Sequence, residues 1–232
     1  MQTIIELKHV VKTYHTAGVA QTVLHDINLT IIHGDFVAIV GASGNGKSTL
    51  LNLLTGIDQP SSGEVIINGL ALQQLSQEKL SAWRCANIGI VFQFFQLLPA
   101  LNLWQNIVLP MDFLGKLPKA QRKARALHLL EQVGLINEAE RLPSQVSGGQ
   151  QQRAAIARAL ANDPELIVAD EPTGNLDETT AESVFQLFCH LRDQGKTLVL
   201  VTHNEAFANA ALRKIEIHAG RIHSVAEPMA AG

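Results

Sequence analysis

Residues 36–55 read FVAIVGASGNGKSTLLNLLT, and this stretch decides the fold. Residues 35–40 form a short apolar run that predicts a buried strand, and residues 49–55 have a helical pattern. Between them, Gly41-Ala-Ser-Gly-Asn-Gly-Lys47-Ser48 fits the spacing G-x-x-x-x-G-K-[ST]. A strand, a glycine-rich loop and a helix in this order predict a phosphate-binding loop.

The chemistry of this loop follows from its residue types. Glycines allow the backbone to turn so that successive N–H groups face an anion, and the helix that follows adds its positive end. We expect Lys47 to reach the β- and γ-phosphates and Ser48 to coordinate Mg²⁺. The alternative, an ordinary glycine turn, does not account for the fixed Lys and Ser. The residues expected to bind the nucleotide here are Gly41, Ala42, Ser43, Gly44, Asn45, Gly46, Lys47, Ser48 and Thr49.

Two further strand ends carry groups that suit the same ligand. The apolar run 166–169 ends in Asp170-Glu171, and the run 197–202 is followed by His203. Ligands of open α/β sheets bind at the carboxyl ends of the strands. We therefore expect Asp170 to hold Mg²⁺, Glu171 to polarise the attacking water and His203 to contact the γ-phosphate. An acidic pair and a histidine that merely face solvent are the alternative.

The remaining pattern predicts an α/β protein with a mainly parallel sheet. Residues 3–11 and 22–31 alternate as strands around a turn at 15–18, residues 214–222 form a hairpin around Ala219-Gly220, and residues 226–232 a frayed tail. Helical patterns cover residues 119–133, 150–162 and 179–194. We expect one domain, with an α/β core and an N-terminal antiparallel β subdomain over 1–92 and 160–232, and an inserted helical subdomain over 93–159.

Composition excludes several classes of protein. The chain has 232 residues, 47% of them hydrophobic, a formal net charge of −3 and two distant cysteines. This excludes disorder, a disulfide scaffold and the basic surface of a general nucleic-acid binder. No apolar run is long enough to span a membrane, and the N-terminus lacks the apolar core of a signal peptide. We expect a cytoplasmic chain.

A second glycine-rich turn begins at Ser147. The stretch Val146-Ser-Gly-Gly-Gln150 precedes the helical pattern and offers a hydroxyl and backbone N–H groups to an anion. It could also serve only as a helix N-cap. Because one loop already holds the triphosphate, we expect this turn to reach the nucleotide of a second copy in a two-fold dimer, with Lys47 from one chain and Ser147 from the other.

These motifs together resemble those of ABC-transporter ATPase subunits, across almost the whole chain. The stretch 146–150 resembles their LSGGQ motif, with Val146 in place of Leu, and implies that Ser147, Gly148, Gly149 and Gln150 bind ATP. Residues 92–99 and 169–177 look most like the branch that includes LolD and MacB. The fold implied is a P-loop NTPase (RecA-like) core.

Four other residues match motifs of that family. The resemblance implies that Tyr14 stacks on adenine, that Gln93 binds metal and water, that Asp177 belongs to the D-loop and that His203 is the switch histidine. Tyr14 could instead be an edge-strand aromatic, and Gln93 a surface residue.

The function expected is an ATP-hydrolysing subunit that dimerises around two ATP and drives a membrane permease, in export or lipoprotein release. The permease would dock near residues 93–99, whose apolar members could alternatively belong to the core. The chain would then lie peripherally on the inner face of the membrane. Other possibilities are a soluble ATPase of this type with a non-transport partner, and an ATP-gated regulatory module.

Overall fold

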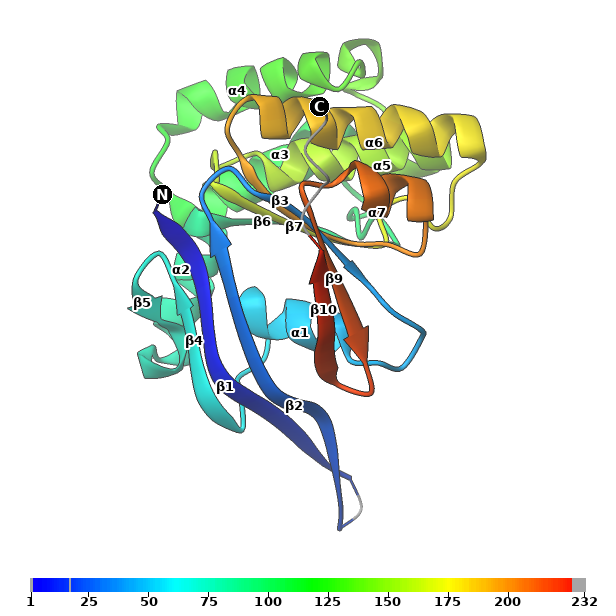
Figure 1. Cartoon of the computed structure of the whole chain (residues 1–232). Helices are drawn as coiled ribbons and strands as arrows, with labels where there is room; N and C mark the ends of the chain where they lie inside the picture. Colours follow the sequence, from blue (N-terminus) through cyan, green and yellow to red (C-terminus); the bar gives the residue numbers. More distant parts are fainter. Residues whose placement is uncertain (1, 17, 227–232) are drawn as a thin grey trace. The chain divides into compact units, whose positions relative to one another are not determined.

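The chain forms two compact units, Met1–Ser81 with Thr197–Gly232, and Ala82–Lys196. The computed structural model describes residues 2–16 and 18–226 (Figure 1). The predicted division into a core and a helical subdomain over 93–159 stays a prediction.

The first unit contains an antiparallel sheet of order β2-β1-β4-β5. Its strands are β1 (Thr3–Thr16), β2 (Val19–Ile32), β4 (Ser62–Ile67) and β5 (Leu70–Ala71). The sheet buries apolar residues, which alternate along β2 at Ile27, Leu29 and Ile31. β1 and β2 form the long hairpin seen in Figure 1. β1 extends to Thr16, within the predicted 15–18 turn, β2 begins at Val19, and Ala17 lies outside the described residues.

The same unit contains parallel strands that carry the phosphate-binding loop. β3 (Phe36–Val40) pairs in parallel with β8 (Thr197–Val201) on one side and with β9 (Arg213–His218) on the other. β10 (Arg221–Ala226) returns antiparallel to β9, as the predicted hairpin. Helices α1 (Lys47–Leu54) and α7 (Glu205–Ala210) follow β3 and β8. The segments after β3 and β8 therefore leave the sheet at neighbouring strand ends. Of the predicted tail, Ala226 ends β10, and residues 227–232 lie outside the described residues.

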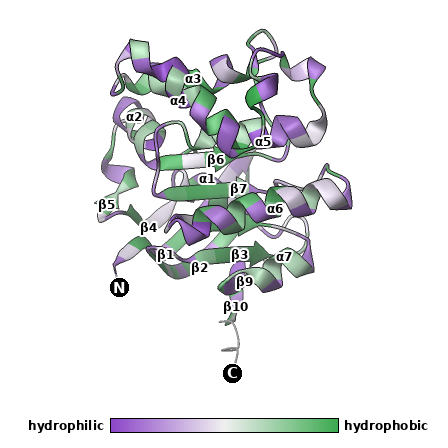
Figure 2. Ribbon diagram, turned by 90° about the horizontal axis from the view of Figure 1, so that it is seen from above, coloured by the Kyte–Doolittle hydropathy of each residue, from purple (hydrophilic) through white to green (hydrophobic). Residues whose placement is uncertain are grey.

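The second unit combines two parallel strands with a group of helices. β6 (Ile88–Val91) pairs with β7 (Leu166–Asp170), which Figure 2 colours as hydrophobic. The helices are α3 (Leu103–Leu114), α4 (Lys119–Gln132), α5 (Gly148–Ala159) and α6 (Glu178–Asp193), with 3₁₀ turns at Ile136–Glu138 and Pro143–Gln145. α3, α4 and α5 pack against one another, and α5 also packs on β6 and α6. α2 (Gln77–Asn87) crosses the boundary of the two units, and a 3₁₀ turn at Leu72–Gln74 precedes it in the first.

The sequence did not define β6, which contains a glycine. A Cβ at Gly89 would lie 2.6 Å from the Ala159 carbonyl oxygen. The strand therefore needs glycine because α5 approaches its backbone closely. Nor did the pattern define α3, because Pro110 lies inside this helix.

The predicted fold class is confirmed: parallel β strands with helices, an antiparallel N-terminal sheet and inserted helices. Within residues 2–16 and 18–226, no helix combines the length and the apolar character that a membrane span requires.

Candidate functional site

The loop 41–46 adopts backbone conformations that only glycine accepts easily. Gly41, Gly44 and Gly46 have φ of 149°, 81° and 94°. A Cβ at Gly41 would lie 2.2 Å from the Ile217 carbonyl oxygen, so this position also lacks room for a side chain. Asn45 donates to the same carbonyl oxygen, at 3.1 Å, and anchors the loop to β9. The contacts with Ile217 of β9 thus fix the conformation of the loop.

Helix α1 begins directly at the loop and has no side-chain cap. Its N-cap residue is Gly46, so the first N–H groups of the helix receive no bond from a capping side chain. Such a helix start attracts an anion, both through these donors and through the positive end of its dipole. Ser48 and Thr49, in this first turn, are exposed and half-buried respectively.

Lys47 lies across the loop with its ammonium group inside it. Its Nζ donates to the carbonyl oxygens of Gly41, at 2.8 Å, and Ala42, at 3.0 Å. The side chain is buried. An ammonium has three N–H donors, and these two bonds leave one for a phosphate oxygen.

Tyr14 lies on β1 of the same unit. Its hydroxyl donates to Asp58 Oδ2 at 2.8 Å, and the ring is partly exposed. Burial, and then the hydrogen bond to Asp58, raises the pKa of the Tyr14 phenol, while a hydrogen bond with the Thr49 side chain acts in the opposite direction. The ring is therefore a fixed, neutral aromatic surface at neutral pH.

His203 shares a cavity with the phosphate-binding loop. This cavity, about 250 Å³ in volume, is lined by Val40, Gly41, Thr202, His203, Glu205, Lys214 and Glu216. The first unit thus brings together the predicted loop and the predicted histidine. Glu205, which begins α7, and Lys214 and Glu216, which lie within β9, were not predicted from the sequence because they match no motif.

The acidic pair lies in the second unit, at the end of β7. Asp170 is the last residue of the strand, and both carboxylates are half-buried. Glu171 has φ of 45°, which is unusual for a residue with a side chain. Such backbone strain gathers at functional sites, where the surrounding structure fixes one geometry.

Gln93 and Glu171 converge beside Gly174. A Cβ placed on Gly174 would lie 3.0 Å from Gln93 Nε2 and 3.5 Å from Glu171 Oε2. Asn175 donates to the Gln93 carbonyl oxygen at 3.2 Å, and the Gly174 N–H donates to the Glu171 carbonyl oxygen. The predicted glutamine and the predicted base therefore lie at one place within this unit.

The turn at Ser147 is a capping box. Ser147 Oγ accepts from the Gln150 N–H at 3.3 Å, and Gln150 Oε1 accepts from the Ser147 N–H at 2.9 Å. A Cβ at Gly149 would meet Thr180 Cγ2 at 2.2 Å, so close packing on α6 requires this glycine. At Gly148, a Cβ would make only ordinary contacts, the nearest with Phe95. Helix packing therefore accounts for Gly149 but not for Gly148.

Asp177 serves as the N-cap of α6. Its Oδ1 accepts from the Thr180 N–H at 3.0 Å, and its Oδ2 accepts from the Thr180 hydroxyl at 2.6 Å. These bonds lower the pKa of the Asp177 carboxyl, the hydroxyl bond most. Thr180 thus contacts both Asp177 and the position of Gly149, which joins two of the predicted motifs.

Arg158, on α5, holds the segment that follows Gln93. Its guanidinium donates to the carbonyl oxygens of Gln96, at 2.5 Å, and Phe95, at 2.8 Å. Phe95 and Gln96 both have positive φ, of 30° and 51°. Burial lowers the pKa of this guanidinium. Sequence analysis missed Arg158, although a cation within the alanine-rich stretch 154–161 is a signal for a specific partner.

Replacing Arg158 with methionine tests this contact. The change keeps the packing of the alkyl stem but removes two charge-assisted hydrogen bonds. We expect the free energy of unfolding in urea to fall by about 2 kcal/mol. Arg125→Met is the control, because Arg125 makes a long bond to a carbonyl oxygen, that of Leu160 at 3.4 Å. Equal stability of the two variants would contradict the role of Arg158.

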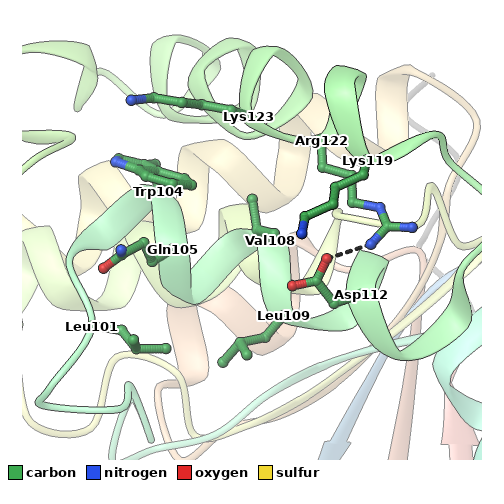
Figure 3. Close-up of a pocket in the computed structure, with 9 residues that line it drawn as sticks. All are labelled: Leu101, Trp104, Gln105, Val108, Leu109, Asp112, Lys119, Arg122 and Lys123. Atoms are coloured by element: carbon green, nitrogen blue, oxygen red, sulfur yellow. Dashed lines mark hydrogen bonds and ion pairs between the residues drawn. The ribbon is translucent and has the colours of Figure 1, made fainter.

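A second cavity, of about 380 Å³, lies between α3 and α4. Figure 3 shows apolar side chains on one side, Lys123 over the Trp104 ring and Arg122 bonded to Asp112. Phe94 and Leu98, on the preceding loop, are 71% and 49% exposed, whereas Phe95 and Leu97 are half-buried. The apolar run after β6 thus contains both exposed and half-buried side chains.

A comparison with known protein families matches residues 24–174 to the model of the ABC transporter family. A protein of Thermotoga maritima, described as an uncharacterized ABC transporter ATP-binding protein, is 45% identical over 225 residues, which are 97% of this chain and 96% of that protein. The macrolide export ATP-binding/permease protein MacB of Sodalis glossinidius is 45% identical over 219 residues. This match covers 94% of the chain but only 33% of MacB.

Solved structures show the same likeness. The ATP-binding cassette MJ0796, in a dimeric post-hydrolysis state bound to ADP and Pi, has a TM-score of 0.90 and 41% identity, and the match covers 97% of this chain and 99% of that one. A second dimeric structure of this cassette has a TM-score of 0.90 and 42% identity, with the same coverage.

Proposed function

The chain belongs to the ABC transporter family as an ATP-binding subunit with ATPase activity, and we propose that it binds Mg-ATP between two copies of itself. Hydrolysis of this ATP would drive a membrane permease. The observation that carries the proposal is the loop 41–48 at the end of β3, with Lys47 inside it and an uncapped helix behind it.

The roles of the nucleotide contacts follow from their chemistry. The N–H groups of residues 42–49 and the Lys47 ammonium bind the phosphates, and the Tyr14 ring carries the adenine. His203 contacts the γ-phosphate, because it lines the same cavity as Gly41. Glu171 polarises the attacking water and Gln93 orients it, because both side chains lie beside Gly174.

The donor set suits Mg²⁺. The Ser48 hydroxyl, the Asp170 carboxylate and the Gln93 amide oxygen are all hard oxygen ligands, which this ion prefers. Bound there, Mg²⁺ would neutralise charge on the phosphates. Support for one shared nucleotide comes from the motifs and the family, since Ser48 lies in the first unit, and Asp170 and Gln93 lie in the second.

The second copy supplies the turn at residues 147–150. Gly148 lacks a packing reason for being glycine, and MJ0796 is a dimer in both matched structures. Thr180 contacts both Asp177 and this turn, and Asp177 would face the second copy. Two ATP molecules would then join two chains.

Mixing two inactive variants tests the shared site. Lys47→Ala and Ser147→Arg each damage both sites of their own homodimer. A mixed dimer contains one site with an intact Lys47 and an intact Ser147, if these come from different chains. After random pairing of equal amounts, about a quarter of all nucleotide sites are intact, and phosphate release should recover to about a quarter of the wild-type rate. No recovery on mixing would contradict a site shared between chains, and Ser147→Arg homodimers with normal turnover would contradict the role of Ser147.

A permease segment would dock near residues 93–99. Phe94 and Leu98 are exposed there, and Arg158 connects this loop to α5, which begins at the turn of residues 147–150. The cavity between α3 and α4 begins at Leu101, directly after the loop. The chain spans about a third of MacB, which is described as joining an ATP-binding part and a permease.

Purification in mild detergent tests this docking. We expect a membrane protein to copurify with the wild type, and less of it to copurify with Phe94→Asp. Copurification of a soluble partner instead would contradict this role.

A further inference from the structure

Three side chains of the first unit form a connected group around the Tyr14 ring. Lys12 Nζ lies 4.7 Å from the ring centroid. The same Nζ donates to Asp58 Oδ1, at 2.6 Å, and to the Gln59 carbonyl oxygen, at 2.8 Å. Asp58 Oδ2 accepts the Tyr14 hydroxyl. One carboxylate therefore ties the ammonium and the phenol together.

The position of each side chain follows from the local fold. Lys12 and Tyr14 are two residues apart on β1, so both point to the same face of the strand. Asp58 lies beyond α1, in the segment whose backbone runs beside β1: the Ser61 N–H donates to the Val11 carbonyl oxygen. The segment is thereby fixed to the strand at the level of the cluster.

The two charged residues are more buried than the ring they hold. Lys12 is 8% exposed, whereas Tyr14 is 37% exposed. A cation placed over an aromatic ring lies on one of its two faces. The ammonium thus occupies one face of Tyr14, and the exposed part of the ring remains available to a ligand.

We propose that Lys12 and Asp58 are positioning residues that lock the Tyr14 ring as a one-sided stacking surface for the base of the nucleotide. The inference rests on the proposed function, because it concerns the same nucleotide. A ring that is already held in place loses little conformational freedom on binding, so the stacking energy is retained in the affinity. In this role both residues act through Tyr14.

The inference predicts a loss of affinity for ATP that is absent for a ligand without the base. We expect Asp58→Ala and Lys12→Met to weaken ATP binding about tenfold, and to change the affinity for inorganic triphosphate less than about twofold. Isothermal calorimetry of the whole chain measures both constants. The matched control is Lys8→Met on the same strand, because Lys8 forms an exposed ion pair with Glu6. Equal losses for both ligands, or no loss for ATP, would overturn the inference.

Tyr14→Ala separates this inference from the proposed function. If that variant binds ATP normally, Tyr14 does not carry the base and the inference fails, while the phosphate-binding loop at 41–48 still carries the proposed function. If it binds ATP weakly while Asp58→Ala and Lys12→Met bind normally, only the positioning role fails.

Tyrosine absorbance gives a second readout, independent of nucleotide. Tyr14 is the only tyrosine of the chain, so an ultraviolet titration of the folded protein reports this phenol alone. Burial raises its pKa most, and the bond and charge of Asp58 raise it further. Asp58→Asn should therefore lower the pKa of Tyr14, and Lys8→Met should not. An unchanged titration in Asp58→Asn would show that the contact is absent in solution and would overturn the inference.

Discussion

Lys47→Ala should lower ATP affinity about 100-fold, through the loss of a charge-assisted contact of about 3 kcal/mol with the phosphates. Lys47 is buried and its ammonium lies inside the loop, bonded to the carbonyl oxygens of Gly41 and Ala42, so an alanine at this position leaves the loop without this donor. The loss should appear for ATP and for inorganic triphosphate alike, because the contact is with phosphate. Equilibrium dialysis with labelled ATP measures it.

The loss of affinity has to be separated from damage to the loop. Lys47 also donates to the carbonyl oxygens of Gly41 and Ala42, so the substitution removes two bonds that shape the loop. Thermal unfolding without nucleotide therefore accompanies the binding measurement. Lys79→Ala is the control, because Lys79 is an exposed lysine of the same unit. A folded Lys47→Ala variant with wild-type ATP affinity would contradict the assignment of the phosphate-binding loop.

The sequence predicts best what depends on local chemistry. The loop at 41–48 could be found because its glycines, its lysine and the flanking elements all lie within one short stretch, and the structure adds the reason for Gly41, which is the approach of Ile217. The same holds for the strands ending at Val40 and Asp170, whose apolar runs are bounded by Asp35 and Gly41 in the first case and by Glu165 and Asp170 in the second.

Contacts made over long sequence separations could not be predicted in this way. Arg158 is separated from residues 95 and 96 by α3 and α4 in the sequence. Asp58 is likewise separated from Tyr14 by β2, β3 and α1. Gly149, the second glycine of the turn at Ser147, shows another limit of sequence patterns. Its spacing suggests ligand binding, yet Thr180 on α6 leaves no room there for a side chain. A single sequence does not distinguish a glycine that close packing requires from one that ligand binding requires.

Glu171→Gln should lower the rate of ATP hydrolysis about 100- to 1,000-fold, as expected when a general base is removed. Glutamine has the size of glutamate and the same backbone preference, so the strained φ of 45° and the neighbouring Gln93 should stay in place. Binding of ATP should persist, because the phosphate contacts of Lys47 and α1 are unchanged. Since hydrolysis is what ends the ATP-bound state, the variant should accumulate as a dimer with ATP, visible by size exclusion.

The control for this variant is Glu131→Gln, an exposed carboxylate on α4 that should leave turnover unchanged. ADP in place of ATP should leave Glu171→Gln monomeric, because the γ-phosphate is then missing. Normal turnover in Glu171→Gln would contradict the assignment of the base. A variant that binds ATP, does not hydrolyse it and stays monomeric would separate the two parts of the proposal: Glu171 would keep its catalytic role, and the clasp between two copies would fail.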